Sequence, residues 1–150
     1  MHEQQRQATG GTDCLVVETV DAFFAVLQRM SAHLSTTAAG LGLAYQQAHL
    51  VRTLREPVPM RECARGLGLD ASNFTGLVDR LEAKGLVERR PDPEDRRVKL
   101  VALTGEGHAL QARLETLLMA APPLVAGLEP HEVATLRDLL RRALAAGPTP

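Results

Sequence analysis

The stretch from residue 70 to residue 104 constrains the fold of this chain more than any other. It begins with apolar residues at the three- and four-residue spacing of a helix that packs on one side, namely Phe74, Leu77, Val78, Leu81 and Leu86. Asp70 occupies the N-cap position, where its carboxylate can accept from free backbone N–H groups, and Gly85 stands where a helix ends in a left-handed residue. We therefore predict a helix over residues 70–85 with both ends fixed locally.

Two short strands should follow this helix. The first covers residues 86–90 and the second residues 98–103, where apolar and polar positions alternate around Val98, Leu100 and Ala102. The segment between them contains Pro91 and Pro93, which lack a backbone donor and interrupt strand pairing. We therefore predict a β-hairpin with a charged loop at residues 91–97.

Residues 60–69 should form a short helix and a glycine-bearing turn that lead into Asp70. The order helix, turn, helix and hairpin is that of a winged helix-turn-helix. In such a module the second helix enters a major groove of DNA and the hairpin, called the wing, reaches a neighbouring minor groove. Together with a preceding helix from Tyr45 to Arg55, this predicts a DNA-binding part at residues 43–104.

These residues resemble the MarR family of transcriptional regulators. The likeness rests on residues 70–90, on Asp95-Arg96-Arg97, which is similar to the family's Asp-x-Arg at the wing, and on Leu103-Thr104 at the start of the next helix. In weaker form it covers residues 13–146. It implies a homodimeric, sequence-specific regulator, usually a repressor, that binds a pseudo-palindromic double-stranded operator and is released by a small aromatic or phenolic effector.

The rest of the chain suits a single, mainly α domain with a small β wing. Residues 13–39 and 105–146 carry apolar stripes at helical spacing and are richer in leucine than a small protein leaves in water, so we expect them to be dimerisation helices. We expect residues 1–12 to be a mobile tail and residues 147–150 a frayed end.

Net charge is the main argument against a nucleic-acid partner. The formal charge is −1 and the pI is near 6.5, whereas DNA-binding domains are usually basic. The cations are unevenly distributed, however, and five of them gather at the wing: Arg89, Arg90, Arg96, Arg97 and Lys99. We therefore expect a local electrostatic footprint and a strong dependence on shape and on two copies binding at once.

Side chains of the second helix that lie off its apolar stripe can face a major groove. Asn can read an adenine edge, and Ser or Thr can contact either phosphate or base. Ser72 and Asn73 lie in the first helical turn and could instead only cap backbone N–H groups. A glycine at position 76 departs from the longer side chain that the family often carries, and allows closer backbone approach. The candidates are Ser72, Asn73, Thr75, Gly76 and Arg80.

At the wing, Arg97 resembles the family's minor-groove arginine, with Asp95 holding it or a neighbouring arginine in place. A guanidinium suits the concentrated negative potential of a narrow groove. Arg96 is a neighbouring candidate. Arg89 and Arg90 are candidates for phosphate contacts, or else belong to a solvated strand edge.

The resemblance also implies an effector crevice between the dimer helices and the DNA-binding part. Its candidate lining lies on or beside the faces that would meet, and comprises Phe23, Leu27, His33, Tyr45, His49 and Cys63. Two alternatives remain open. One is thiol-based redox sensing through Cys14, whose pKa a nearby helix N-terminus would lower. The other is a winged-helix module that binds protein.

No spacing points to an enzyme, a cofactor or a metal site. The five histidines form no HxxxH or HxH pair, and no glycine-rich phosphate loop, nucleophile elbow or CxxC is present. Cys14 and Cys63 lie too far apart in sequence to suggest a disulfide framework. Without an apolar run of about 18 residues or an apolar signal region, we expect a cytoplasmic location.

Overall fold

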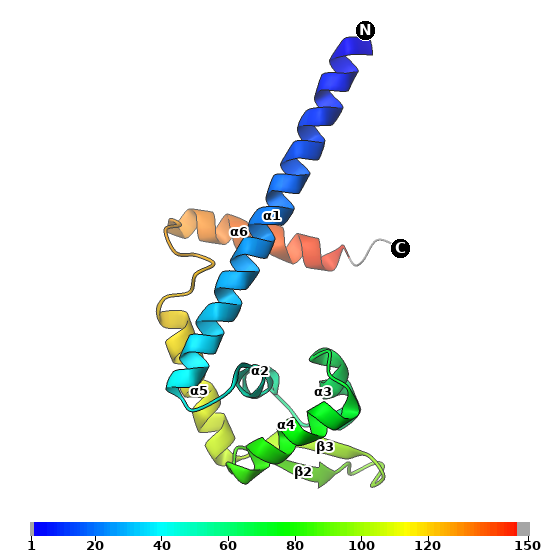
Figure 1. Ribbon diagram of the computed structural model, residues 1–150, viewed down its shortest axis with the longest axis vertical. Coiled ribbons are helices and arrows are strands. Elements are labelled where there is room, and N and C mark those ends of the chain that lie inside the picture. Colours follow the sequence, from blue (N-terminus) through cyan, green and yellow to red (C-terminus); the bar gives the residue numbers. More distant parts are fainter. Residues whose placement is uncertain (1, 147–150) are drawn as a thin grey trace.

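A long helix rises from a cluster of shorter elements (Figure 1). The structure is a computed structural model that describes the backbone of residues 2–146 and the side chains of residues 13–146. That description leaves out the side chains of the predicted mobile tail at residues 1–12. It also leaves out the predicted frayed end at residues 147–150 altogether. In chain order the elements are α1 (His2–Gly40), α2 (Tyr45–Thr53), β1 (Val58–Pro59), α3 (Met60–Gly66), α4 (Ala71–Ala83), β2 (Val87–Pro91), β3 (Lys99–Leu103), α5 (Gly105–Ala120) and α6 (Pro130–Ala145).

Local sequence fixes both ends of α4. Asp70 Oδ1 accepts from the backbone N–H of Asn73 at 2.8 Å, so Asp70 is the N-cap, as predicted. Gly85 has the left-handed φ of +70° predicted for it, and the Leu86 N–H then bonds to the Leu81 carbonyl. Four residues of the predicted apolar stripe are buried and anchor α4 to the core, namely Phe74, Leu77, Val78 and Leu81, whereas the fifth, Leu86, is buried beyond the end of α4.

The wing belongs to a three-stranded antiparallel sheet in the order β1-β3-β2, whereas the sequence predicts only two strands. β2 pairs with β3 from Val87 opposite Leu103 to Pro91 opposite Lys99. The expectation that Pro91 lies in the loop is therefore wrong, since a proline is tolerated where a strand ends. β1 pairs with the other edge of β3, and at two residues it is too short to give a periodic signal.

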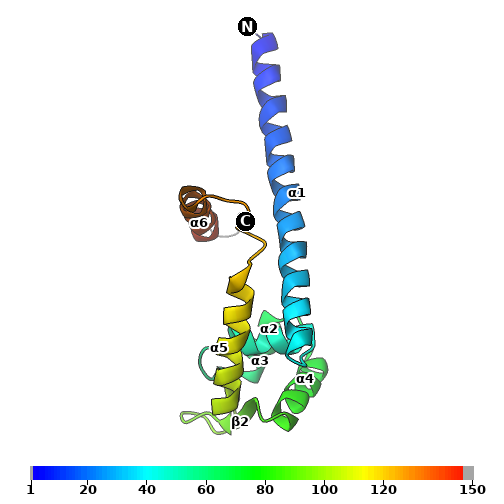
Figure 2. The same ribbon diagram turned by 90° about the vertical axis from the view of Figure 1, so that its left-hand side faces the viewer.

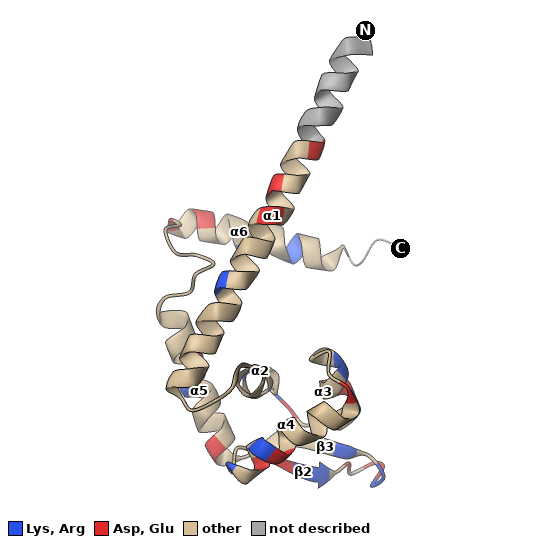
Figure 3. Cartoon of the chain, in the orientation of Figure 1, with Lys and Arg blue, Asp and Glu red and all other residues tan. Residues whose placement is uncertain are grey.

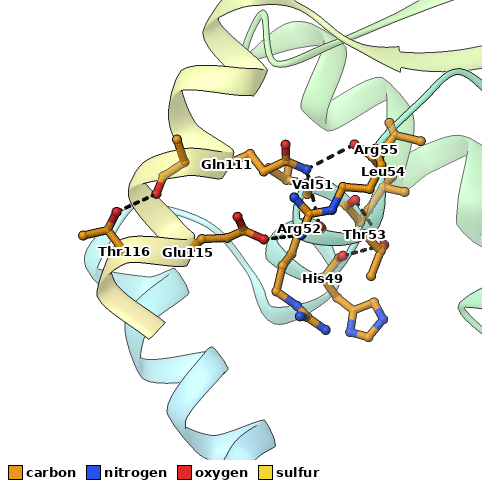
Figure 4. A network of polar contacts seen from close by, with 11 residues as sticks. His49, Val51, Arg52, Thr53, Leu54, Arg55, Gln111, Glu115 and Thr116 are labelled. Carbon is orange, nitrogen blue, oxygen red and sulfur yellow. Dashed lines mark hydrogen bonds and ion pairs between the residues drawn. The ribbon is translucent and has the colours of Figure 1, made fainter. Parts of the chain in front are cut away.

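Side-chain contacts also join α5 to α2 (Figure 4). The Gln111 side chain is buried, and its Nε2 donates to the carbonyls of Val51 at 2.7 Å and Leu54 at 3.1 Å. These carbonyls belong to the last turn of α2, which has no helical donors left for them. An ion pair between Arg55 and Glu115 lies beside this contact. α5 therefore holds α2 in place through side-chain bonds that span about 60 residues of sequence.

Large apolar side chains remain exposed on the terminal helices. On α1, Phe23 is 49% exposed and Phe24 is 59% exposed, and on α6 Leu144 is 82% exposed. No side chain of α6 is buried, and Figure 2 shows α6 standing apart from α1 although their ribbons cross in Figure 1. The predicted dimerisation helices thus present the uncovered apolar surface expected of them. None of the helices in the described part of the chain combines the length and hydrophobicity needed to span a bilayer.

Candidate nucleic-acid interface

The start of α4 is held by side-chain bonds among its own candidate DNA-binding residues. Ser72 Oγ donates to Asp70 Oδ1 at 2.7 Å, and Asn73 Nδ2 donates to Asp70 Oδ2 at 2.6 Å. Together with the Asn73 N–H, the largest cause, these donors lower the pKa of the Asp70 carboxyl. The Ser72 and Asn73 side chains therefore support the Asp70 cap and do not themselves bond to a backbone N–H group, and both residues stay exposed.

Further along α4, the lack of a side chain at Gly76 leaves room for the side chain of Arg80. The position that a Gly76 Cβ would occupy lies 3.5 Å from Nη1 of Arg80, so the guanidinium lies along the helix beside the glycine. Thr75 is also exposed, and its Oγ1 donates to the Ala71 carbonyl at 2.7 Å. The exposed face of α4 therefore combines hydroxyl, amide and guanidinium groups with a gap at its centre.

The wing loop is organised by two aspartates that bond to the backbone. Asp92 Oδ1 accepts from the Glu94 N–H at 2.9 Å, and Asp95 Oδ1 accepts from the Arg97 N–H at 3.0 Å. Asp95 thus holds Arg97, as the resemblance implied, but through the backbone. Among the side chains of residues 13–146, neither Arg96 nor Arg97 forms an ion pair. Both guanidinium groups are exposed and available to an anion.

Arg89 is placed differently from the other wing arginines. Its side chain is 22% exposed and forms ion pairs with Asp79, at 2.5 Å, and with Glu82, both on α4. Nη2 also lies 3.3 Å from the Thr75 carbonyl, and the Arg89 N–H donates to Glu82 Oε1 at 3.1 Å. Arg89 therefore connects β2 to α4 and does not belong to a solvated strand edge, while its phosphate contact stays a prediction.

The two faces of β2 separate neighbouring arginines. Because side chains alternate along a strand, Arg90 points away from α4, and its side chain is 48% exposed with only a 3.9 Å contact to Glu88. Figure 3 shows basic positions on β2, β3 and the wing loop beside α4. The basic positions of the wing therefore lie beside α4, whereas the Arg90 side chain lies on the opposite face of β2, next to Arg55 and Glu56.

A cavity of about 320 Å³ lies between α1, α2 and α5. Three of the six predicted effector residues line it, namely Leu27, Tyr45 and His49. Its other walls are mainly apolar. They also include Arg52, a cation that was not among the predicted effector residues. Burial, followed by the nearby Arg52 charge, lowers the pKa of His49, so His49 is neutral near pH 7. The cavity can therefore hold a hydrophobic body next to one positive charge.

The other three predicted effector residues lie outside this cavity. Phe23 is on the exposed face of α1, one turn before Leu27. The His33 ring Nε2 lies 3.2 Å from the Leu118 carbonyl and ties α1 to α5. Cys63 lines a separate space of about 210 Å³ between α2, β1 and α3. His49 lines both spaces, and the assignment of all six residues to one effector crevice stays a prediction.

Residues 43–99 match the sequence model of the MarR family. The crystal structure of wild-type MarR from Escherichia coli, in its apo form, superposes with a TM-score of 0.72 at 30% sequence identity, covering 83% of this chain and 94% of that chain. The chain belongs to the MarR family.

Two further solved structures and one curated protein are also similar to this chain. A mutant of Escherichia coli MarR in complex with operator DNA has a TM-score of 0.68 at 29% identity, covering 86% of this chain and 95% of that chain. CouR from Rhodococcus jostii RHA1, bound to p-coumaroyl-CoA, has a TM-score of 0.66 at 33% identity, covering 85% of this chain and 91% of that chain. In sequence, Escherichia coli K12 MarR is 39% identical over 85 residues, or 55% of this chain and 59% of the curated protein's length.

The cysteines of this MarR-family chain do not have the environment of reactive thiols. Cys14 lies well inside α1, and its Sγ donates to Glu18 Oε1 at 3.1 Å, which raises its pKa. The expected lowering by a helix N-terminus is therefore wrong. Burial, followed by the Glu62 charge, raises the pKa of Cys63. Among residues 13–146, no three His, Cys, Asp or Glu side chains gather in a way that could hold a metal ion.

Proposed function

We propose that this MarR-family chain is a dimeric, sequence-specific DNA-binding regulator, without enzymatic activity, that represses transcription in the cytoplasm, where its DNA would be. One observation carries the proposal: the exposed polar face of α4 lies next to a wing whose Arg96 and Arg97 have no ion-pair partner among residues 13–146. A fold shared with a relative solved on operator DNA supports it.

In this proposal α4 enters the major groove, with Asn73, Ser72, Thr75 and Arg80 facing base edges or phosphates. Because Ser72 and Asn73 bond to Asp70, each can bind DNA only through its remaining hydrogen-bonding capacity or by exchanging that partner. Gly76 gives the backbone room to approach the bases. Arg97 reaches the minor groove next to it, with Arg96 beside it, and Arg90 faces a phosphate.

A second copy would cover the exposed apolar surface of α1 and α6. Contiguous apolar patches of this kind mark protein interfaces. Two-fold symmetry then implies two half-sites about one helical turn apart, roughly 10 bp. Selection of bound fragments from random duplexes, with light scattering of the purified protein, tests both points. A monomer, or a single isolated half-site, contradicts the dimer.

We expect Arg97→Ala to weaken binding to the selected duplex by about 1–3 kcal/mol, because it removes one directed contact in a groove of strong negative potential. Fluorescence anisotropy with a labelled duplex measures this effect. Arg113→Ala, which removes the same charge from an exposed position on α5, is the matched control. Equal affinities for the Arg97 variant and the parent would exclude the wing from the interface. Affinity that does not fall with salt would favour a protein-binding module instead.

We further propose that the cavity between α1, α2 and α5 binds a small aromatic acid that releases DNA. Its volume is at the low end for ligand pockets, its walls are mainly apolar, and Arg52 can pair with a carboxylate. A relative solved with p-coumaroyl-CoA supports an aromatic acyl ligand. The cavity opens beside α2, which α5 holds through Gln111, so a ligand there can shift these helices.

For this site we expect p-coumarate to bind by calorimetry and Arg52→Gln to weaken that binding about tenfold, since a hydrogen bond to a charged group is worth about 1.5–3 kcal/mol. Arg29→Gln, which changes an exposed arginine of α1 outside the cavity lining, is the control. Equal weakening by both variants, or a parental affinity of Arg52→Gln for p-coumarate, would rule out this cavity as the carboxylate site.

A further inference from the structure

A groove of about 490 Å³ lies between the start of α3 and the base of the wing. Residues 59–62 form one wall and residues 97–99 form the other. The walls carry three cations, Arg61, Arg97 and Lys99, and a single carboxylate, Glu62. Among the side chains of residues 13–146, none of these three cations forms an ion pair. The groove therefore holds an excess of positive charge that no described carboxylate neutralises.

Strand pairing explains why these cations meet. β1 lies antiparallel to β3, with Pro59 opposite Leu100, and α3 starts at Met60, immediately after β1. Arg61 therefore comes to lie beside Lys99 and Arg97, although more than 30 residues separate them in sequence. Mutual repulsion disfavours such a cluster in isolation, so the arrangement favours an anion in the groove.

We propose that this groove binds a phosphate of the DNA backbone, with Arg61 and Lys99 as contacts in addition to the α4 and wing residues. The inference rests on the proposed function. A minor groove is only about 6 Å wide and a phosphate backbone runs along each of its edges, so a wing that inserts Arg97 brings its own side against a phosphate. The protein groove that contains Arg61 and Lys99 lies on that side of the wing. A guanidinium can bind two phosphate oxygens at once, which suits Arg61.

This assignment makes Arg61 a sequence-independent contact. A phosphate contact adds the same free energy to every duplex, whereas a base contact adds it only to the cognate one. It also releases condensed counterions, which gives a characteristic dependence on salt. The equal effect on both duplexes distinguishes Arg61 from a base contact, and the change in salt dependence distinguishes it from a residue that acts only by stabilising the fold.

The test measures affinity at several salt concentrations for the selected duplex and for a scrambled duplex. We expect Arg61→Gln to weaken binding to both by about tenfold and to reduce the slope of log K against log salt by about 0.9. Arg113→Gln on α5 is the charge-matched control and should leave both quantities unchanged. Glu62→Gln removes the only carboxylate of the groove and should strengthen binding to both duplexes, an effect that a destabilised variant would not produce.

Three outcomes would overturn the inference: an Arg61→Gln protein with parental affinity and slope, a loss confined to the selected duplex, or a Glu62→Gln protein that binds no better than the parent. A parent protein that binds no duplex at any salt concentration would refute the proposed function itself. This outcome differs from the three above, in which the parent protein binds DNA and only the role of Arg61 fails.

Discussion

Gly107→Ala is expected to lower the free energy of unfolding by about 3 kcal/mol, at the upper end for an overpacked site. A Cβ at position 107 would lie 2.0 Å from the Leu86 carbonyl oxygen and 3.2 Å from the Leu103 Cβ. The Leu86 oxygen cannot move aside cheaply, because it accepts the Thr104 N–H at 3.1 Å. The extra methyl group would therefore push the start of α5 away from the junction between α4 and β2.

Gly105→Ala is the matched control, two residues earlier in the same helix. Apart from its chain neighbours and the backbone of its own helix, nothing lies within 4 Å of the added Cβ, so this change should be neutral or should stabilise the protein by about 0.4–1 kcal/mol. Urea denaturation followed by circular dichroism gives both values. The close packing of α5 on the DNA-binding part would be refuted if the two variants unfolded at the same urea concentration.

Arg89→Ala is expected to weaken duplex binding by about 1 kcal/mol, although Arg89 itself need not touch DNA. The side chains of its partners Asp79 and Glu82 are 60% and 41% exposed, and an ion pair of that exposure contributes about 0.2–1 kcal/mol. Here the Arg89 guanidinium joins Asp79 and Glu82, so its loss both releases α4 from β2 and leaves two unpaired carboxylates next to the proposed DNA-binding face. The first effect loosens the helix that would enter the major groove, and the second places two negative charges near the DNA phosphates. Both effects should weaken DNA binding.

The salt dependence separates this role from a phosphate contact. For Arg89→Ala we expect the slope of log K against log salt to stay close to the parental value, because Arg89 is already paired with carboxylates. Arg90→Ala, its neighbour on the opposite face of β2, should lose less affinity but should reduce the slope by about 0.9. A reduced slope in the Arg89 variant would support the prediction that Arg89 contacts phosphate.

Elements whose signals are local could be predicted from the amino-acid order. Asp70 and Gly85 set the ends of α4 through one side-chain cap and one left-handed residue, and both were predicted. Thr104, at the predicted start of the next helix, accepts from the Gly107 N–H at 3.0 Å. The apolar stripe of α4 was found because its period follows from helix geometry alone. These features depend on residues within a few positions of one another, so no knowledge of the fold is needed to find them.

Which charges are neutralised and which remain available depends instead on how the elements pack. Arg89 and Arg97 have the same side chain, yet Arg89 is paired with α4 because alternation along β2 turns it towards that helix. Arg61 joins the wing cations only because β1, a strand of two residues, pairs with β3. Likewise Arg52 enters the cavity only through the packing of α2 against α1 and α5. Such contacts join residues distant in the chain, and the free energy of a charge depends on its neighbours in space, which the order of residues does not reveal.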